Sequence, residues 1–301
     1  EKGAGLVWCT VFAGPLVAAQ QLAREGEGEE TCVRGMLEPV LREVVRPLRL
    51  DKKALVLLDS LHGDGVTLSE VERLGLHYVV GANKLERTAV TLSEQPEIVW
   101  QDTGASAGRH WSASGVCVCW LQCEGWERKR ILVGRRFKRE GDFLWRYAGV
   151  MTDLAERDVR HVMREGLSYG EAIWRLYDGK AGMECHYKDL LSDLGLHHPP
   201  CQEHVRNAGF YAVASLAHTL GTAVDLIGGK GADRGSRQRK DGGALRRARP
   251  RRMRLWRLRR RLLALPGRVA LHARELTVTL LGLSEQMQEE FQRFFLNVCR
   301  C

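Results

Sequence analysis

Residues 53–59 read Lys-Ala-Leu-Val-Leu-Leu-Asp, an unbroken apolar run that ends in an acid. Such a run is typical of a strand buried on both faces of a parallel sheet. It presents Asp59 at the carboxyl end, where open α/β sheets place their sites. Helical spacing at 68–74 and a second strand-like run at 77–82 follow. The order strand, helix, strand predicts a βαβ unit within a largely parallel sheet.

The sequence before this unit predicts two strands, at 5–13 and 15–23, and a helix over 31–48. Between them, Glu25–Glu30 is an acidic stretch broken by glycine, which is typical of a turn. The chain opens on Glu1 and enters the first strand almost at once, so we expect sequence upstream of it to be missing.

Residues 90–152 have a different character, because short alternating runs are separated by Gly, Ser and Asp. The runs lie at 97–101, 115–123, 129–137 and 143–152, and they predict a β-rich insertion. Cationic side chains and tryptophans within it would supply charge for phosphate and flat faces for stacking on bases. They are Arg128, Lys129, Arg130, Arg135, Arg136, Lys138, Arg139, Trp120, Trp126 and Trp145. A plain antiparallel sheet with a solvated Arg and Lys face explains the same pattern, and both interpretations stay open.

Further along, residues 174–188 read Trp-Arg-Leu-Tyr-Asp-Gly-Lys-Ala-Gly-Met-Glu-Cys-His-Tyr-Lys. On a helix, the spacing of Tyr177, Lys180, Glu184 and Lys188 puts one acid and three partners on a single face. A carboxylate held among cations stays ionised and can bind a divalent metal beside phosphate. An amphipathic surface helix with a Glu–Lys pair is the simpler interpretation of this segment alone.

The motif Tyr177-x2-Lys180-x3-Glu184 resembles the Tyr-x2-Arg-x3-Glu signature of DDE insertion-sequence transposases, with Lys in place of Arg. Residues 188–196, and Asn207 with the apolar run that follows it, resemble the continuation of that family. The resemblance covers most of residues 50–280. It implies an α/β fold in which a ribonuclease-H-like mixed sheet is flanked by helices, with a β-rich insertion between the second and third catalytic acids.

The resemblance also implies a site. Asp59 corresponds to the second acid and Glu184 to the third, and together they would hold Mg²⁺ or Mn²⁺ for phosphodiester chemistry. Tyr177, Lys180 and Lys188 would contact DNA beside the metal. No Asp occurs before Asp51, so the first acid is absent, and we expect an amino-terminally truncated and inactive chain. The alternative for Asp59 is an ordinary capping residue at a strand end.

The carboxyl-terminal part is strongly basic. Residues 228–243 are glycine-rich and charged and predict a linker, and ten arginines follow between 246 and 261 without an acid among them. We expect Arg257 and Arg260, together with Arg128, Arg130 and Arg135, to contact DNA. An unstructured tail that binds any polyanion is the alternative. His197, His198, Cys201 and His204 match no common zinc spacing, and we expect a helix-entry turn there.

Composition agrees with a nucleic-acid partner. The chain has 301 residues, 44% of them hydrophobic, and a formal net charge of +9, so it can bury a core and favours a polyanion. No apolar run approaches the roughly 20 residues that cross a bilayer, and nine cysteines without a framework indicate a reducing compartment. We therefore expect a bacterial cytoplasmic, nucleoid-associated protein with no membrane contact.

The sequence thus predicts a DNA transposase that cleaves and transfers strands at the ends of a mobile element. Its partners would be double-stranded DNA of transposon ends and target, and it would be a homodimer on DNA. The alternative is a non-catalytic, DNA-binding transposase remnant. The expected layout is a first core segment at 1–89, the insertion at 90–152, the second core segment at 153–227, the linker at 228–243 and the basic region at 244–301.

Overall fold

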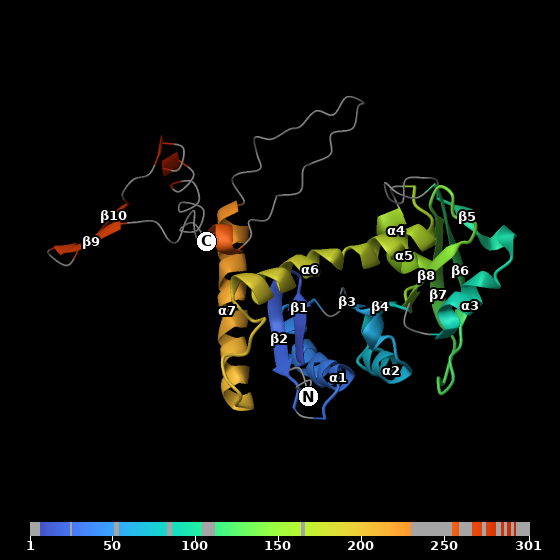
Figure 1. Cartoon of the computed structure of the whole chain (residues 1–301), viewed down its shortest axis with the longest axis horizontal. Coiled ribbons are helices and arrows are strands. Elements are labelled where there is room, and N and C mark those ends of the chain that lie inside the picture. Colours follow the sequence, from blue (N-terminus) through green and yellow to red (C-terminus); the bar gives the residue numbers. More distant parts are fainter. Residues whose placement is uncertain are drawn as a thin grey trace. The chain divides into compact units, whose positions relative to one another are not determined.

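In a computed structural model, the protein divides into two units (Figure 1). One unit comprises residues 1–9 and 23–184, and the other comprises 10–22 and 185–301. The structure describes residues 7–24, 26–50, 54–82, 86–103, 112–163, 166–229, 255–258, 267–272 and 275–280, with 284, 285, 288, 289 and 292. The predicted linker and most of the basic region lie outside the described residues.

The first unit is built on a six-stranded mixed sheet, in the order β3-β4-β8-β7-β6-β5. The strands are β3 (Leu55–Leu58), β4 (His77–Gly81), β5 (Gln101–Asp102), β6 (Ala113–Leu121), β7 (Arg130–Lys138) and β8 (Arg146–Thr152). β3 and β4 are parallel, and the other neighbours are antiparallel. The prediction of a mixed sheet is confirmed. The prediction that the sheet is largely parallel is wrong, because only β3 and β4 are parallel. The strands after β4 include two short connections, with positive φ at Gly125 and Gly141, and such connections join only antiparallel neighbours.

The predicted βαβ unit is confirmed. β3 pairs with β4 from Leu55↔His77 to Leu58↔Val80, and α2 (Gly65–Arg73) connects them. Asp64 caps this helix, because its carboxylate accepts a hydrogen bond from the Thr67 backbone N–H at 2.8 Å. The cap marks where α2 begins. The apolar run ends with β3 at Leu58, so Asp59 directly follows the carboxyl end of the strand.

Residues 90–152 continue this same sheet, because β8 pairs with β4 at Val79↔Thr152. The alternation expected at 97–101 is a 3₁₀ turn, Glu97–Val99, and only the two-residue strand β5 follows. Pro96 precedes this turn and cannot donate to a strand ladder, which favours the turn over a strand.

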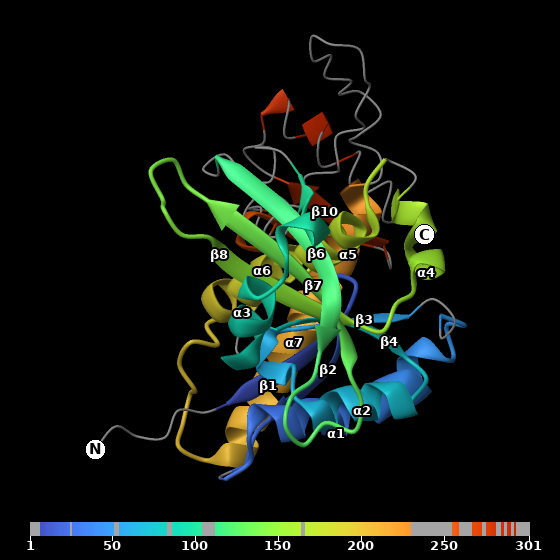
Figure 2. The same cartoon turned by 90° about the vertical axis from the view of Figure 1, so that its right-hand side faces the viewer.

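Helices cover both faces of the sheet (Figure 2). Besides α2, the helices of the first unit include α1 (Glu29–Val40), which packs against α2 and runs into a π-helical turn at Leu41–Val45, α3 (Glu86–Ser93), α4 (Glu156–Met163) and α5 (Tyr169–Asp178). Gly134 of β7 lies against Leu92 of α3, and a Cβ at Gly170 of α5 would lie 3.4 Å from Val133. Since Val133 and Gly134 are consecutive in one strand, α3 and α5 pack on opposite faces.

The core lies beneath α5. Val79, Val116, Val133 and Val150 of four strands meet Ile173 and Trp174, which are also buried. A capping box at the start of α5 fixes that helix, since Ser168 accepts from the Glu171 N–H and the Glu171 carboxylate accepts from the Ser168 N–H.

The second unit is organised around α7 (His204–Gly229), which packs on the hairpin of β1 (Trp8–Ala13) and β2 (Leu16–Leu22). Val17 N–H donates to Thr219 Oγ1 at 3.2 Å, and the Ser215 hydroxyl donates to Gln20 Oε1 at 2.8 Å. The remaining elements are α6 (Ala181–Lys188), a π-helical turn at Asp189–Asp193, α8 (Leu255–Leu258), β9 (Gly267–His272) and β10 (Glu275–Leu280). The division between the units falls within α6, after Glu184.

α7 begins directly after the histidine-rich turn, as predicted. Asn207 closes that turn, since its Nδ2 donates to the Cys201 carbonyl at 2.8 Å and its Oδ1 accepts from the Cys201 thiol at 3.3 Å. The expectation that no apolar run approaches membrane length is corrected. By length and composition His204–Ile227 could cross a membrane, with a mean hydropathy of 1.3. One such helix is weak evidence, because a helix of a soluble protein can meet the same criteria.

Candidate functional site

Asp59 lies at the carboxyl end of β3, as the apolar run predicts. Its carboxylate accepts a hydrogen bond from the Ser60 N–H at 2.6 Å and caps the 3₁₀ turn Ser60–His62, which is the capping role that the sequence left open. Lys180 Nζ lies 3.1 Å from Asp59 Oδ1. Partial burial acts to raise the pKa of Asp59, but these two partners outweigh it, and the pKa is lowered. The carboxylate is therefore held ionised at the edge of the sheet.

Tyr177, in the last turn of α5, reaches the end of the neighbouring strand. A Cβ placed on Gly81 would lie 2.6 Å from the Tyr177 hydroxyl oxygen and 2.9 Å from Ser60 Cβ, so any larger residue there would have to displace these side chains. Burial, and next the negative charge of Asp59, raise the pKa of Tyr177. Tyr177 and Lys180 thus meet Asp59 at the carboxyl ends of β3 and β4.

The helix that carries the signature is interrupted between these two residues and Glu184. α5 ends at Asp178 and α6 begins at Ala181, and the junction has tight i→i−3 hydrogen bonds. Lys180 N–H donates to the Tyr177 carbonyl at 2.9 Å, and Met183 N–H donates to the Lys180 carbonyl at 2.7 Å. The expected single helical face is therefore wrong, because a turn of three residues changes the angle between successive side chains.

Glu184 and Lys188 complete the signature from α6, where both side chains are exposed. Glu184 belongs to the first unit, with Asp59, whereas Lys188 belongs to the second. Within the part of the chain that the structure describes, no three His, Cys, Asp or Glu side chains form a group that could hold a metal. Two carboxylates, at Asp59 and Glu184, are the hard oxygen donors that fit Mg²⁺ or Mn²⁺ in chemical type.

Arg130 does not lie on the surface as predicted. Its side chain is 3% exposed and forms an ion pair with Glu72, at 3.2 Å from Nε to Oε1. Its guanidinium also stacks on Trp126, 4.9 Å from the ring centroid, and donates to Ser69 Oγ at 3.2 Å. The expected contact between Arg130 and DNA is therefore corrected: in this fold the residue ties β7 to α2.

Arg128 joins the same acid from outside. Its Nη2 lies 2.8 Å from Glu72 Oε2, and the Arg128 side chain is 60% exposed. Burial acts to raise the pKa of Glu72, but the two arginines outweigh it and the pKa is lowered. Arg128 keeps enough exposure to meet a ligand, although Glu72 already neutralises part of its charge.

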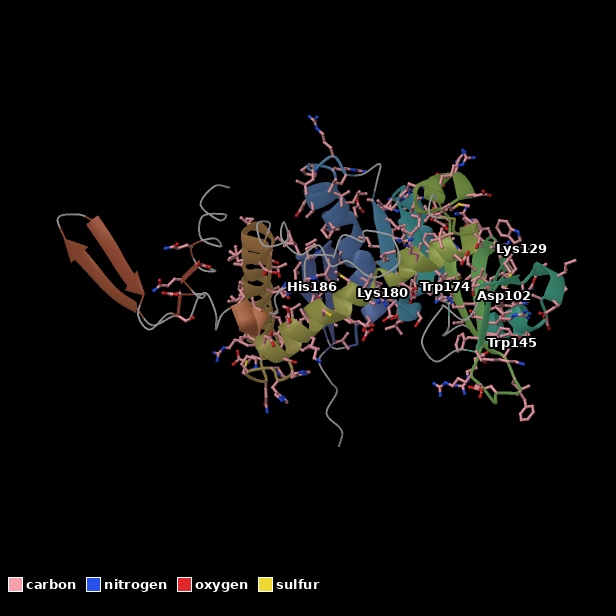
Figure 3. All side chains as sticks on the ribbon, turned by 90° about the horizontal axis from the view of Figure 1, so that it is seen from above. Asp102, Lys129, Trp145, Trp174, Lys180 and His186 are labelled. Carbon is pink, nitrogen blue, oxygen red and sulfur yellow. The ribbon has the colours of Figure 1, made fainter. Side chains whose placement is uncertain are left out.

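Arg135 and Arg136 stack on tryptophan rings. Arg135 lies over Trp174 of α5, which Figure 3 marks, at 4.3 Å from the ring centroid. Arg136 lies over Trp145 at 4.3 Å and is also paired with Glu97. Burial lowers the pKa of Arg135. Much of the cation and tryptophan pattern thus holds the sheet and α5 together.

Two site residues were missed by the sequence reasoning. Gly81 had a signal, because a glycine inside an apolar strand often marks a close approach of another group. Nothing in the sequence indicated Glu72, because an acid on an amphipathic helix that pairs with a buried arginine looks the same in sequence as an acid that faces solvent. Of the arginines in the basic region, Arg257 lies in α8, and Arg260 is outside the described residues.

Comparison with known proteins adds no relative. A scan of the chain against protein-family models finds no match, and a search of curated proteins finds none either. The functional argument therefore rests on the geometry at the ends of β3 and β4, on the charge of the chain and on the resemblance of its motifs.

Proposed function

We propose that the chain belongs to a DDE-type DNA transposase with a ribonuclease-H-like core, an enzyme that cleaves phosphodiester bonds and transfers strands at the ends of a mobile element. The chain supplies the second and third acids, and it has no Asp before Asp51 to serve as the first. One observation carries the proposal. Two residues of the signature motif, Tyr177 and Lys180, lie against the end of β3 beside Asp59. The ion pair of 3.1 Å brings the cation of the signature motif to the proposed second acid.

In this proposal Asp59 and Glu184 hold Mg²⁺ or Mn²⁺. When bound, the metal would activate a nucleophile and neutralise charge at phosphorus. Lys180 balances the Asp59 carboxylate and brings a cation to the edge where a phosphate would lie. Lysine offers a point charge without the bidentate fork of arginine, so it fixes a phosphate less strictly than the usual signature residue does.

The proposed partner is double-stranded DNA, of the transposon ends and the target, bound by a homodimer in the bacterial cytoplasm. The net charge of +9 supports a polyanionic partner. Binding by charge is equally expected of the second candidate, a DNA-binding remnant without catalysis. The two acids separate the candidates, because binding requires the cations and cleavage requires the carboxylates.

Cleavage of a plasmid that carries the element's ends, in the presence of Mg²⁺, tests the proposal. The protein should include any coding sequence that precedes Glu1 in its gene. We expect Asp59→Asn and Glu184→Gln to lower cleavage by at least about 100-fold, the upper end of what loss of an outer-shell partner costs a metal site. Glu94→Gln is the matched control, since Glu94 is an exposed acid away from this edge.

DNA binding by the same variants, measured by gel shift, distinguishes the outcomes. Binding that persists while cleavage is lost supports the proposal. Cleavage that survives in Glu184→Gln contradicts it, and binding without cleavage by every form, including the unaltered protein, leaves the remnant as the answer.

A further inference from the structure

Arg136 of β7 has a side chain that two tryptophan rings hold in place. Its guanidinium carbon lies 4.7 Å from the centroid of the Trp100 ring and 4.3 Å from that of Trp145, which Figure 3 labels. The Arg136 side chain is only 11% exposed. Because burial and the two rings confine the guanidinium, the direction of its N–H donors is fixed before any anion binds to them.

The anion at this guanidinium is the carboxylate of Glu97. Arg136 Nη1 donates to Glu97 Oε2 at 2.6 Å, and Arg136 Nη2 donates to Glu97 Oε1, so the contact is bidentate. The hydrogen bonds from Arg136, together with the charges of Arg136 and Lys138, lower the pKa of Glu97. Lys138 Nζ also lies 4.7 Å from the centroid of the Trp145 ring. Two cations beside tryptophan rings thus act on one ionised carboxylate.

The two partners of this ion pair are held very differently. The Glu97 side chain is 78% exposed, whereas the Arg136 side chain is nearly buried. Glu97 begins the 3₁₀ turn Glu97–Val99, and its carbonyl accepts a hydrogen bond from the Trp100 N–H at 3.1 Å. Rotation about the side-chain bonds of Glu97 can therefore release the carboxylate into water while the backbone stays in place. The guanidinium would remain against the tryptophan rings, with both of its Nη donors uncovered.

A phosphate of a DNA backbone fits the place of this carboxylate. The planar fork of an arginine binds a carboxylate and a phosphate through the same two parallel hydrogen bonds. Lys138 adds a second positive charge at the same place. The net charge of +9 favours a polyanionic ligand over a single acid. The exposed acid therefore occupies a site that also suits a nucleic-acid phosphate.

We propose that Glu97 is an intramolecular competitor for DNA, whose carboxylate occupies the Arg136 fork until a backbone phosphate displaces it. The proposal rests on the proposed function for the identity of the partner, DNA, and it involves neither Asp59 nor Glu184. The exchange breaks one ion pair and forms another, and the released carboxylate returns to solvent. Because one anion replaces another, Arg136 adds little net affinity in the unaltered protein. Stable binding then depends on further contacts with the DNA.

DNA binding by Glu97→Ala tests this competition. The dissociation constant of a fluorescein-labelled duplex oligonucleotide is measured by anisotropy at several salt concentrations. Because the variant leaves Arg136 open to phosphate, we expect the affinity to rise about tenfold and the salt slope to steepen by about one. Glu94→Ala is the matched control, since it removes an exposed acid from the same segment. For this control we expect a rise of no more than about threefold and an unchanged slope.

A double variant assigns the gain to the arginine. Adding Arg136→Gln to Glu97→Ala should abolish both the rise in affinity and the steeper slope, and far-ultraviolet dichroism checks that this variant folds. The comparison of the two alanine variants decides the question even if it does not, because both replace exposed acids. A gain in Glu97→Ala no larger than in Glu94→Ala, or one that survives in the folded double variant, overturns the inference and leaves the proposed function intact. Absence of DNA binding by every form overturns both.

Discussion

Replacing Glu72 by Gln should destabilise the protein more than the loss of any surface ion pair. Glu72 is the partner of Arg130, whose side chain is 3% exposed, through contacts of 3.2 and 3.3 Å. Removing one member of a buried ion pair costs about 3–5 kcal/mol, because the other charge stays buried without compensation. Gln keeps an acceptor for Arg130, so we expect a loss of about 2–4 kcal/mol.

Urea unfolding followed by tryptophan fluorescence measures this loss. Arg128→Met is the matched control: Arg128 binds the same acid but is 60% exposed, so its removal should cost no more than about 1 kcal/mol. Adding Arg130→Met to Glu72→Gln removes the uncompensated charge and should recover part of the stability. If Glu72→Gln costs no more than Arg128→Met, the argument that Arg130 is a buried structural residue is refuted.

Three further predictions concern the site and the basic region. Gly81→Ala should lower the free energy of unfolding in urea by about 1–3 kcal/mol, because its methyl group meets the Tyr177 hydroxyl, and adding Tyr177→Phe should recover part of this loss. An unchanged free energy of unfolding in Gly81→Ala would contradict this packing. Burial lowers the pKa of His62, so the folded protein binds a proton there less readily than the unfolded chain, and the free energy of unfolding should fall as pH drops below ~6.5. When the free energy of unfolding is measured from pH 8 to 5, His62→Gln should show a smaller decline than the unaltered protein. Arg257→Ala with Arg260→Ala should reduce the salt slope of DNA binding by about two, and an unchanged slope would place these residues outside the interface.

The local fold could be predicted where neighbouring residues decide it. The run at 53–59 and the pattern up to residue 82 predicted β3, α2, β4 and the position of Asp59, because burial on both faces leaves a continuous apolar signature. Pairing between distant segments could not. Nothing in the sequence near Val79 indicates that its strand neighbour is Thr152, and this pairing made the sheet mixed.

The candidate site divides in the same way. The signature motif identified Tyr177 and Lys180, which lie beside Asp59. The prediction that the whole motif lies on one continuous helix was wrong, because a tight turn at Gly179 separates α5 from α6. The tryptophan and arginine pattern was equally consistent with DNA contacts and with internal stacking. In the folded protein Arg130 pairs with Glu72 and Arg135 stacks on Trp174. These partners belong to other elements, so the sequence around the arginines could not indicate them.

The tryptophans of the chain are distributed unequally between its two units, so tryptophan fluorescence reports mainly on one of them. Seven of its eight tryptophans, at positions 8, 100, 111, 120, 126, 145 and 174, fall in the first unit, and Trp256 alone falls in the second. Indole emission therefore follows the melting of the first unit, whereas far-ultraviolet dichroism also registers the long α7 helix. Should the units melt separately, the two signals will give different midpoints, and a single unfolding free energy will not describe the molecule.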